Sequence, residues 1–168
     1  LESETFDKVI FATHSDQALK LLEKPTREES KILKALPYQK NEVLLHLDDS
    51  ILPKRKLAWA SWNYLLDSNF DSPVALTYNM NILQNLNSDN TFCVTLNNHS
   101  TIDPNKVLKK IIYHHPLFTA DGIKAQAKKH EISGKNNTYY CGAYWQNGFH
   151  EDGVVSALDV CKQFGLKL

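Results

Sequence analysis

Two glycines near the C-terminal end of the sequence stand where the backbone could bind a ligand. Gly142 lies in a stretch typical of a strand, residues 138–143, and Gly153 lies in the first turn of a helix predicted from residue 151 or 152 to about residue 164. Gly142 lets the backbone leave the strand freely, and Gly153 lets a ligand approach the amides of the helix start. Those amides and the positive end of the helix dipole stabilise negative charge. The pattern predicts a phosphate or cofactor site, and the alternative left open is that both glycines only form a turn.

Aromatic side chains form a second set of candidate binding residues. Tyr144 and Trp145 lie in the loop between the two glycines, where an aromatic wall could orient an apolar or amine substrate. In the middle of the chain, the candidate substrate residues are Trp62, Asn63, Tyr78 and Asn79. The side chains of Asn63, Asn79 and Asn81 would supply hydrogen bonds to the substrate. The alternative for each aromatic residue is ordinary packing in the core of a half-buried sheet.

The histidines do not form a recognisable metal or hydrolase site. His114 and His115 are adjacent, which does not direct both rings to one side of a helix or strand, and the sequence has no HxxxH or HExxH. His14, Ser15 and Asp16 have the side chains of a catalytic triad, but neighbours in sequence seldom meet in that geometry, and no GxSxG motif is present. We therefore expect no metal site, interpret this segment as the cap at a strand end, and name no catalytic residue.

Composition and charge exclude several classes of protein. Nineteen basic residues balance nineteen acidic ones among 168, so no overall field favours nucleic acid or an anionic membrane. No stretch approaches the roughly 20 apolar residues of a membrane-spanning helix, and the acidic N-terminus is unlike a signal peptide. The three cysteines form no CxxC pair, which favours reduced, buried thiols over disulfides or a zinc site. These features predict a cytoplasmic protein without a nucleic-acid partner.

The opening of the chain predicts a strand followed by two helices. Residues 6–13 are mostly apolar, as in a strand buried in a parallel sheet. Ser15 or Asp16 is the expected N-cap of the first helix, at 17–22. Thr26 is the expected cap of the second helix, at 27–36.

The middle of the chain alternates short runs of aromatic and β-branched residues with polar turns. Four strands of a mixed or antiparallel sheet are predicted, at 41–47, 58–65, 74–79 and 92–96. Asp103 followed by Pro104 indicates the start of a helix. The apolar face of that helix would hold Val107, Leu108, Ile111 and Ile112. A further helix is predicted at 120–129.

The predicted fold class is α+β, with α/β character at both ends of the chain. The opening strand and helix and the closing strand, loop and helix look like parts of one layer. A domain with a mixed sheet and helices would be inserted between them.

Several segments together resemble a known family. The strand Tyr139-Tyr140-Cys141-Gly142-Ala143 and the stretch from Gly148 to Ala157 resemble the C-terminal FAD motif of flavin-containing amine oxidases. The opening stretch from Val9 to Thr13 likewise resembles the strand at which the FAD domain of that family hands over to the substrate domain. Further segments resemble a bacterial branch of predicted FAD/NAD-binding oxidoreductases in that superfamily, and these are Ala12-Thr13-His14-Ser15-Asp16-Gln17-Ala18, Trp59-Ala60-Ser61-Trp62-Asn63-Tyr64, Tyr113-His114-His115-Pro116 and Cys141-Gly142-Ala143-Tyr144-Trp145.

The resemblance implies how the chain would contact FAD. Gly142 and Ala143 would lie by the pyrophosphate and ribityl part, and the amides of Gly153 and Val154 would face the O2 edge of the flavin. The full set of implied cofactor residues is Gly142, Ala143, Tyr144, Trp145, Gly148, Asp152, Gly153 and Val154. Two positions depart from the family pattern, because Ala143 replaces an acidic residue and the usual glycine-alanine pair is Gly153-Val154.

The resemblance also implies the domain organisation. Residues 1–24 would end a Rossmann-like FAD-binding domain, 25–133 would form the substrate domain, and 134–168 would return as the C-terminal FAD-binding strand, loop and helix. The sequence has no GxGxxG, which in the family binds most of the dinucleotide. We therefore expect a fragment, whether cloned, proteolytic or one half of a split gene, whose missing N-terminal FAD-binding half is a partner.

The function implied is the C-terminal part of an FAD-dependent oxidoreductase of the amine-oxidase type. The intact protein would bind FAD and oxidise a small-molecule or lipid substrate by hydride transfer to the flavin, and the fragment alone would be inactive and free of FAD. Strand edges exposed by the missing half could pair two copies into a homodimer. The alternative is a non-catalytic binding or interaction domain that retains the flavoprotein fold.

Overall fold

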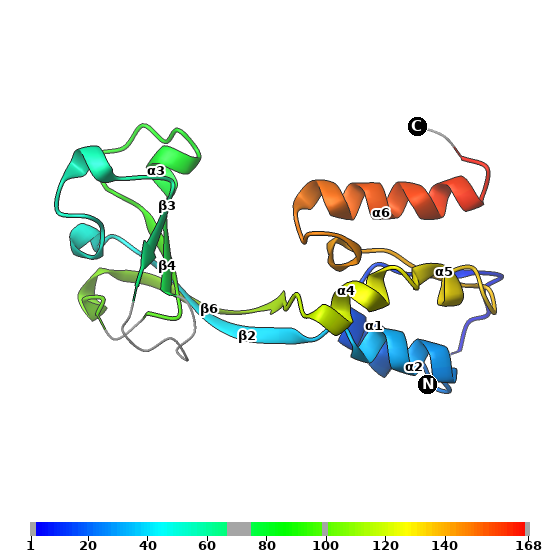
Figure 1. Cartoon of the computed structure of the whole chain (residues 1–168). Coiled ribbons are helices and arrows are strands. Elements are labelled where there is room, and N and C mark those ends of the chain that lie inside the picture. The colour runs from blue at the N-terminus through cyan, green and yellow to red at the C-terminus, as the bar shows by residue number, and fades with distance from the viewer. Residues whose placement is uncertain (1–2, 67–74, 99–100, 167–168) are drawn as a thin grey trace. The chain divides into compact units, whose positions relative to one another are not determined.

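Segments from the two ends of the chain fold together, and the middle of the chain folds on itself. The computed structural model describes residues 3–66, 75–98 and 101–166. It divides the chain into residues 1–39 with 116–168, here called the terminal unit, and residues 40–115, the sheet unit. In Figure 1 the terminal unit comprises the blue start and the yellow-to-red end of the chain, and the sheet unit comprises the cyan-to-green middle.

The first and last strands of the terminal unit pair with each other. Strand β1 (Val9–Phe11) runs parallel to β7 (Thr138–Tyr140), with Ile10 opposite Tyr139. Both are short runs of β-branched and aromatic residues, the types that favour extended backbone. The expectation that the two ends of the sequence share one layer is thus confirmed, although each strand is shorter than predicted.

Five helices and a shared core complete the terminal unit. The helices are α1 (Ser15–Leu21), α2 (Arg27–Lys34), α4 (Ala120–Gln126), α5 (Lys129–Ile132) and α6 (His150–Gln163). The single helix predicted at 120–129 is thus two helices, α4 and α5. The buried core comprises Ala18, Ile32, Leu33, Leu36, Ala125, Ile132, Tyr140, Tyr144 and Trp145. These residues come from both ends of the sequence, so the terminal unit is a single packed body.

The starts of α1 and α2 differ in how well the sequence predicted them. Thr26 caps α2 as expected, because its side-chain hydroxyl accepts a hydrogen bond from the Glu29 amide at 3.1 Å. In return, the Glu29 carboxylate accepts a hydrogen bond from the Thr26 amide. For α1 the expectation was wrong, since the N-cap is His14. Ser15 is instead fully buried, and its hydroxyl donates to the Leu36 carbonyl at 2.7 Å, which joins α1 to the end of α2.

The sheet unit is built on a five-stranded sheet. Its strands lie in the order β3 (Trp62–Leu65), β4 (Ala75–Asn79), β5 (Cys93–Leu96), β2 (Tyr38–His46) and β6 (Val107–Pro116). The pairs β3–β4, β4–β5 and β5–β2 are antiparallel. A short helix, α3 (Met80–Leu83), follows β4. Together with the helices of the terminal unit, this sheet confirms the α+β class.

Two predictions for the middle of the chain differ from the structure. Residues 107–112 form a strand and not a helix, because Asp103 caps only one 3-10 turn (Pro104–Lys106) before β6 begins. The Leu47 amide donates to the Lys106 carbonyl at 3.0 Å, and this bond starts β6 beside the end of β2. Tertiary pairing here overrides a local helix signal. The strand expected at 58–65 begins only at Trp62, after a 3-10 turn (Lys56–Ala58), and Val74, expected in β4, lies outside the described residues.

The unit boundaries differ from the domain boundaries expected at 24/25 and 133/134. Helix α2 packs against α4 and against α5 in the terminal unit, and the two units divide at 39/40 and 115/116. The domain boundaries themselves concern an intact flavoprotein and stay a prediction.

Two further expectations concern the cysteines, expected as reduced and buried thiols, and the lengths of the helices. Cys93 and Cys141 are buried, Cys161 is half-buried, and all three thiols are free. Within the described ranges, each helix is too short or too polar to cross a lipid bilayer.

Candidate functional site

The loop after β7 depends on a glycine at its second position, Gly142. A β-carbon at Gly142 would lie 2.5 Å from Cε1 and 2.9 Å from Cδ1 of the Tyr144 ring, which is closer than real contacts allow. The Gly142 amide donates to the Ser156 hydroxyl at 3.2 Å, and this bond joins the loop to α6. The backbone then forms a 3-10 turn (Ala143–Trp145). The expected role of Gly142 as the point where the chain leaves the strand therefore has a local steric reason.

Tyr144 and Trp145 are core residues of the terminal unit. They are only 3% and 6% exposed, and their ring centroids are 5.0 Å apart. Tyr38 meets Tyr144 edge to face at 6.4 Å. Burial raises the pKa of the Tyr144 hydroxyl well above its ordinary value, and the nearby Tyr38 adds to the shift. In the described structure these two side chains pack the core and do not form an open aromatic wall.

Hydrogen bonds to three backbone carbonyls of the loop hold the rest of it in place. The Gln126 side chain donates to the Tyr144 carbonyl at 2.9 Å and to the Gln146 carbonyl at 2.6 Å. The Gly148 amide donates to the Ala143 carbonyl at 3.2 Å, and Gly148 has a positive φ of 90° that suits glycine. Gln126, which the sequence did not single out, therefore holds the candidate loop in place.

Asp152 supplies the negative charge at the start of α6. Its buried carboxylate accepts hydrogen bonds from the Asn147 amide at 3.2 Å and the Phe149 amide at 2.9 Å. A carboxylate in the first turn stabilises the positive end of the helix dipole. Because the chain already places an anion there, the helix start suits a neutral or partly charged ligand edge better than a phosphate.

Gly153 and Val154 lie on the accessible side of this helix start. The Gly153 amide donates to the Phe149 carbonyl at 3.3 Å, so it is engaged within the helix. A β-carbon at Gly153 would meet only Ala143, at an ordinary contact distance of 3.9 Å. Val154 is half exposed. The structure brings Gly153 and Ala143 together, but the amide of Gly153 is not free.

The four candidate substrate residues of the sheet unit divide between two faces. Trp62 and Tyr78 are opposite each other on β3 and β4, with their rings edge to face at 5.3 Å, and Trp62 is 46% exposed. Burial raises the pKa of Tyr78, with a smaller contribution from Tyr64. Asn63 and Asn79 point to the other face because side chains alternate along a strand.

Both asparagines bind the chain itself. The Asn63 amide closes a turn by donating to the Ala60 carbonyl at 2.7 Å. Asn79 is 1% exposed and caps α3 by accepting from the Ile82 amide at 3.2 Å. Of the four residues, Trp62 and Tyr78 therefore offer a surface to a ligand, and the asparagines position backbone.

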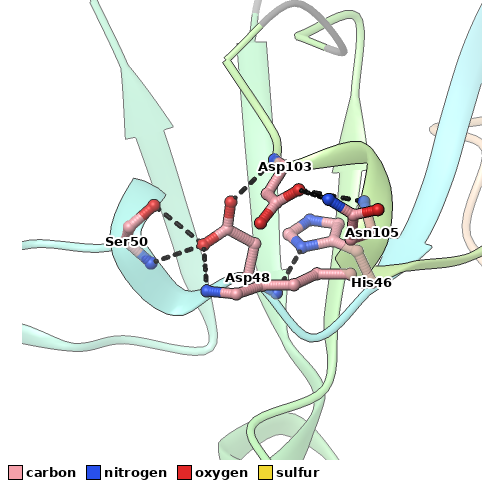
Figure 2. A network of polar contacts seen from close by, with 6 residues as sticks. His46, Asp48, Ser50, Asp103 and Asn105 are labelled. Carbon is pink, nitrogen blue, oxygen red and sulfur yellow. Dashed lines mark hydrogen bonds and ion pairs between the residues drawn. The ribbon is translucent and has the colours of Figure 1, made fainter.

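A buried carboxylate in the sheet unit was missed by the sequence reasoning (Figure 2). Asp48 accepts hydrogen bonds from the Ser50 hydroxyl at 2.8 Å, the Asp103 amide at 2.9 Å and the Lys106 ammonium at 3.1 Å. Burial alone would raise the pKa of Asp48, but these hydrogen bonds outweigh it and hold the pKa far below its ordinary range. The spacing Asp48-x-Ser50 is an ordinary turn signal, so the only hint in the sequence was local.

A fully buried imidazole continues this network into the sheet. His46 Nδ1 accepts from the Asp48 amide at 3.1 Å, and Nε2 lies 2.8 Å from the Thr95 hydroxyl, which lies 2.8 Å from that of Thr77. Burial lowers the pKa of His46, against a smaller opposing effect of Asp48. The neutral ring accepts at Nδ1 and donates at Nε2. Since the imidazole and the carboxylate are buried and already paired, the network positions loops and strands.

The candidate cofactor residues all lie in the terminal unit, and the candidate substrate residues all lie in the sheet unit. No group of three or more metal-ligating side chains lies close together in the part of the chain that the structure describes. No model of a known protein family matches the sequence, and no curated protein matches it.

Proposed function

We propose that this chain is the C-terminal part of an FAD-dependent oxidoreductase of the amine-oxidase type, with a Rossmann-like terminal unit. The observation that carries the proposal is the unit formed by β7, Gly142, the closed loop and α6 beside the parallel strand β1. A strand, a glycine exit and a helix start next to a parallel neighbour are the parts from which dinucleotide-binding layers are built.

Within this proposal, bound FAD would supply the hydride-accepting chemistry, and the residues of this chain would bind and orient the cofactor and the substrate. Ala143, which carries only a methyl group, would let the cofactor approach its backbone, whereas at Gly142 the approach would be from the side opposite the Tyr144 ring. Asp152 keeps the helix start ordered by holding two loop amides. Trp62 and Tyr78 offer an aromatic surface to an apolar or amine substrate.

We further propose that a separate FAD-binding half completes the layer at β1. Among the described residues, β1 has a strand partner on one side only, and its Val9 and Ile10 side chains are 43% and 49% exposed. Parallel strands are normally covered on both faces and continued by further parallel strands. The free thiols agree with a cytoplasmic location for the assembled enzyme.

The test is the flavin content of the complete gene product with Gly153→Leu. We expect the parent to be purified yellow and the variant to lose flavin, because the added side chain would occupy the accessible space beside Ala143. Lys162→Leu, in the last turn of the same helix and exposed, is the matched control and should keep its flavin. This chain alone should show no flavin absorbance after gel filtration.

The alternative is a non-catalytic binding domain that retains this fold. The observation that favours it is that Asp152, Tyr144 and Trp145 are used for capping and core packing. A colourless complete protein, or full flavin occupancy in Gly153→Leu with a raised thermal midpoint, would contradict the flavoenzyme proposal.

A further inference from the structure

A pocket in the terminal unit is lined by none of the candidate cofactor residues. It has a volume of about 350 Å³, and Ala127, Lys129, His130, Ser133, Asp159 and Gln163 line it. The lining residues come from α5, its flanks and the last turns of α6. This volume is at the lower end of the range for small-molecule sites, so the pocket suits a ligand of few heavy atoms.

The amine of Lys129 is held in a fixed position at this pocket. Its Nζ donates to the Ser156 hydroxyl at 3.0 Å and lies 5.8 Å from the centre of the Trp145 ring. Ser156 is 1% exposed, and its hydroxyl also accepts the Gly142 amide, so it cannot turn away easily. A lysine side chain normally samples many rotamers, and these contacts restrict it.

The surroundings of Lys129 favour the neutral amine. Burial lowers the pKa of Lys129, while Asp159 on α6 and Cys141 after β7 oppose the shift. Asp159 is shared with Lys162, whose ammonium lies 3.4 Å from its carboxylate. His130, the neighbour of Lys129 on α5, lines the same pocket.

We propose that Lys129 is a nucleophilic amine that forms a Schiff base with small aldehydes or ketones entering this pocket. The Nζ lone pair attacks the carbonyl carbon, a C–N bond forms, and a proton passes from nitrogen to oxygen to give a carbinolamine. Loss of the hydroxyl group with the second nitrogen proton releases water and leaves the C=N bond. No oxidant or reductant is needed, and His130 and Ser133 are the pocket groups that can relay the protons. The site does not depend on the proposed flavin function.

Two neighbouring lysines provide internal references for a test. Lys124 and Lys128 are exposed and form surface ion pairs with Asp121 at 3.4 Å and Glu131 at 3.9 Å. Neither lines the pocket. If Lys129 only packs against Trp145, it should react more slowly than these two, because it is less accessible.

The experiment treats the folded chain with propanal and sodium cyanoborohydride at pH 7 and measures the initial alkylation rate of each lysine by peptide mass spectrometry. We expect Lys129 to react roughly tenfold faster than Lys124 and Lys128, because burial lowers its pKa and so raises the share of neutral amine at pH 7. Its rate should also reach half-maximum at a lower pH. Equal or slower reaction of Lys129 would overturn the proposal.

A conservative variant tests the electrostatic part. Asp159→Asn removes a carboxylate that favours the charged ammonium, so alkylation of Lys129 at pH 7 should become faster. Glu151→Gln, at the exposed start of the same helix, is the matched control and should leave the rate unchanged. A slower or unchanged rate in Asp159→Asn, with the fold intact by circular dichroism, would count against the assignment.

Discussion

At the scale of single residues, the two loop glycines differ in what a methyl group would meet. At Gly142 it would overlap the Tyr144 ring, and at Gly153 it would touch Ala143 at an ordinary distance. This contrast arises because Gly142 lies directly under a buried ring, whereas Gly153 lies on an accessible turn of α6.

We therefore predict opposite effects of alanine at the two positions. Gly142→Ala should lower the free energy of unfolding by about 1–3 kcal/mol, as overpacking does in other cores. Gly153→Ala should raise it by roughly 0.5–1 kcal/mol, because alanine is the better helix former. Urea unfolding of the two variants beside the parent measures both signs. Equal effects would mean that the Tyr144 ring moves aside at little cost.

Tyr140 provides a second contrast at this scale. Its hydroxyl donates to the Glu29 carboxylate at 2.7 Å, and both side chains are buried. Tyr140→Phe should cost about 1–3 kcal/mol, since it leaves a buried carboxylate oxygen without this donor. Tyr139→Phe on the same strand is the control, because the Tyr139 hydroxyl makes no hydrogen bond to a described residue. Similar losses in urea unfolding for the two variants would refute the role given to the Glu29 bond.

Side chains that act locally could be predicted from the sequence, and those that act through distant partners could not. The Thr26 cap follows from residues three apart. The burial of Glu29 against Tyr140 joins residues 111 positions apart, so no local pattern reports it. The candidate loop glycines and Asp152 were named from the sequence, but the bonds of Asp152 to the loop amides and the Gln126 contacts were not predicted, because they depend on how the loop folds back.

At the scale of elements, β6 shows how pairing decides between alternatives. Residues 107–112 have apolar positions that fit one face of a helix, yet they are also rich in β-branched residues. The Lys110 ammonium lies 2.6 Å from the Glu42 carboxylate on β2, which holds the two strands side by side. Glu42 is far from residues 107–112 in the sequence, so the local pattern does not include this partner. The helix start at Asp103 was therefore wrongly extended from one turn to a full helix.

The buried network between β2, β5 and the loop at 48–51 predicts acid sensitivity of the sheet unit. The pKa of His46 is lowered from 6.5, so below that pH the unfolded state binds a proton that the folded state does not. The free energy of unfolding therefore falls as pH decreases from 6.5, by at most about 1.4 kcal/mol per pH unit. Asp48, whose folded pKa is depressed, adds a further loss only below its ordinary value of 3.8.

Hydrogen exchange of the β2, β4 and β5 amides at pH 7 and pH 5.5 measures this effect, once corrected for intrinsic exchange rates. His46→Gln should remove the difference in opening free energy between the two pH values. His130→Gln, which changes an exposed histidine of the terminal unit, should retain it. A pH difference that survives in His46→Gln would assign the sensitivity to another group.

At the scale of the whole molecule, the terminal unit is formed by segments that are far apart in the sequence. The pairing of β1 with β7 could be anticipated because both ends have the pattern of buried parallel strands. The unit boundaries could not, since they depend on α2 packing against α4 and α5. What remains open to solvent at β1 then decides how the chain behaves in solution.

The edge of β1 should pair with a second copy of the chain when no other strand is present. The Val9 amide donates to the Asn137 carbonyl at 2.9 Å, and the Phe11 carbonyl accepts from the Cys141 amide at 3.0 Å. Backbone groups alternate along a strand, so the amide and carbonyl of Ile10 point to the opposite, unpaired edge. An exposed edge with half-exposed Val9 and Ile10 side chains favours association.

Proline at two adjacent positions separates the open edge from the paired one. Ile10→Pro removes the donor on the open edge and leaves the bonds of Val9 and Phe11 to β7 in place, so the variant should stay folded. Val9→Pro removes the bond to Asn137 and should destabilise the terminal unit. Sedimentation equilibrium over a range of concentrations should show the mass of the parent rising above 19.2 kDa, while Ile10→Pro stays at that value. A parent that stays monomeric at every concentration, or an Ile10→Pro variant that associates as the parent does, would show that this edge is protected by something other than a strand.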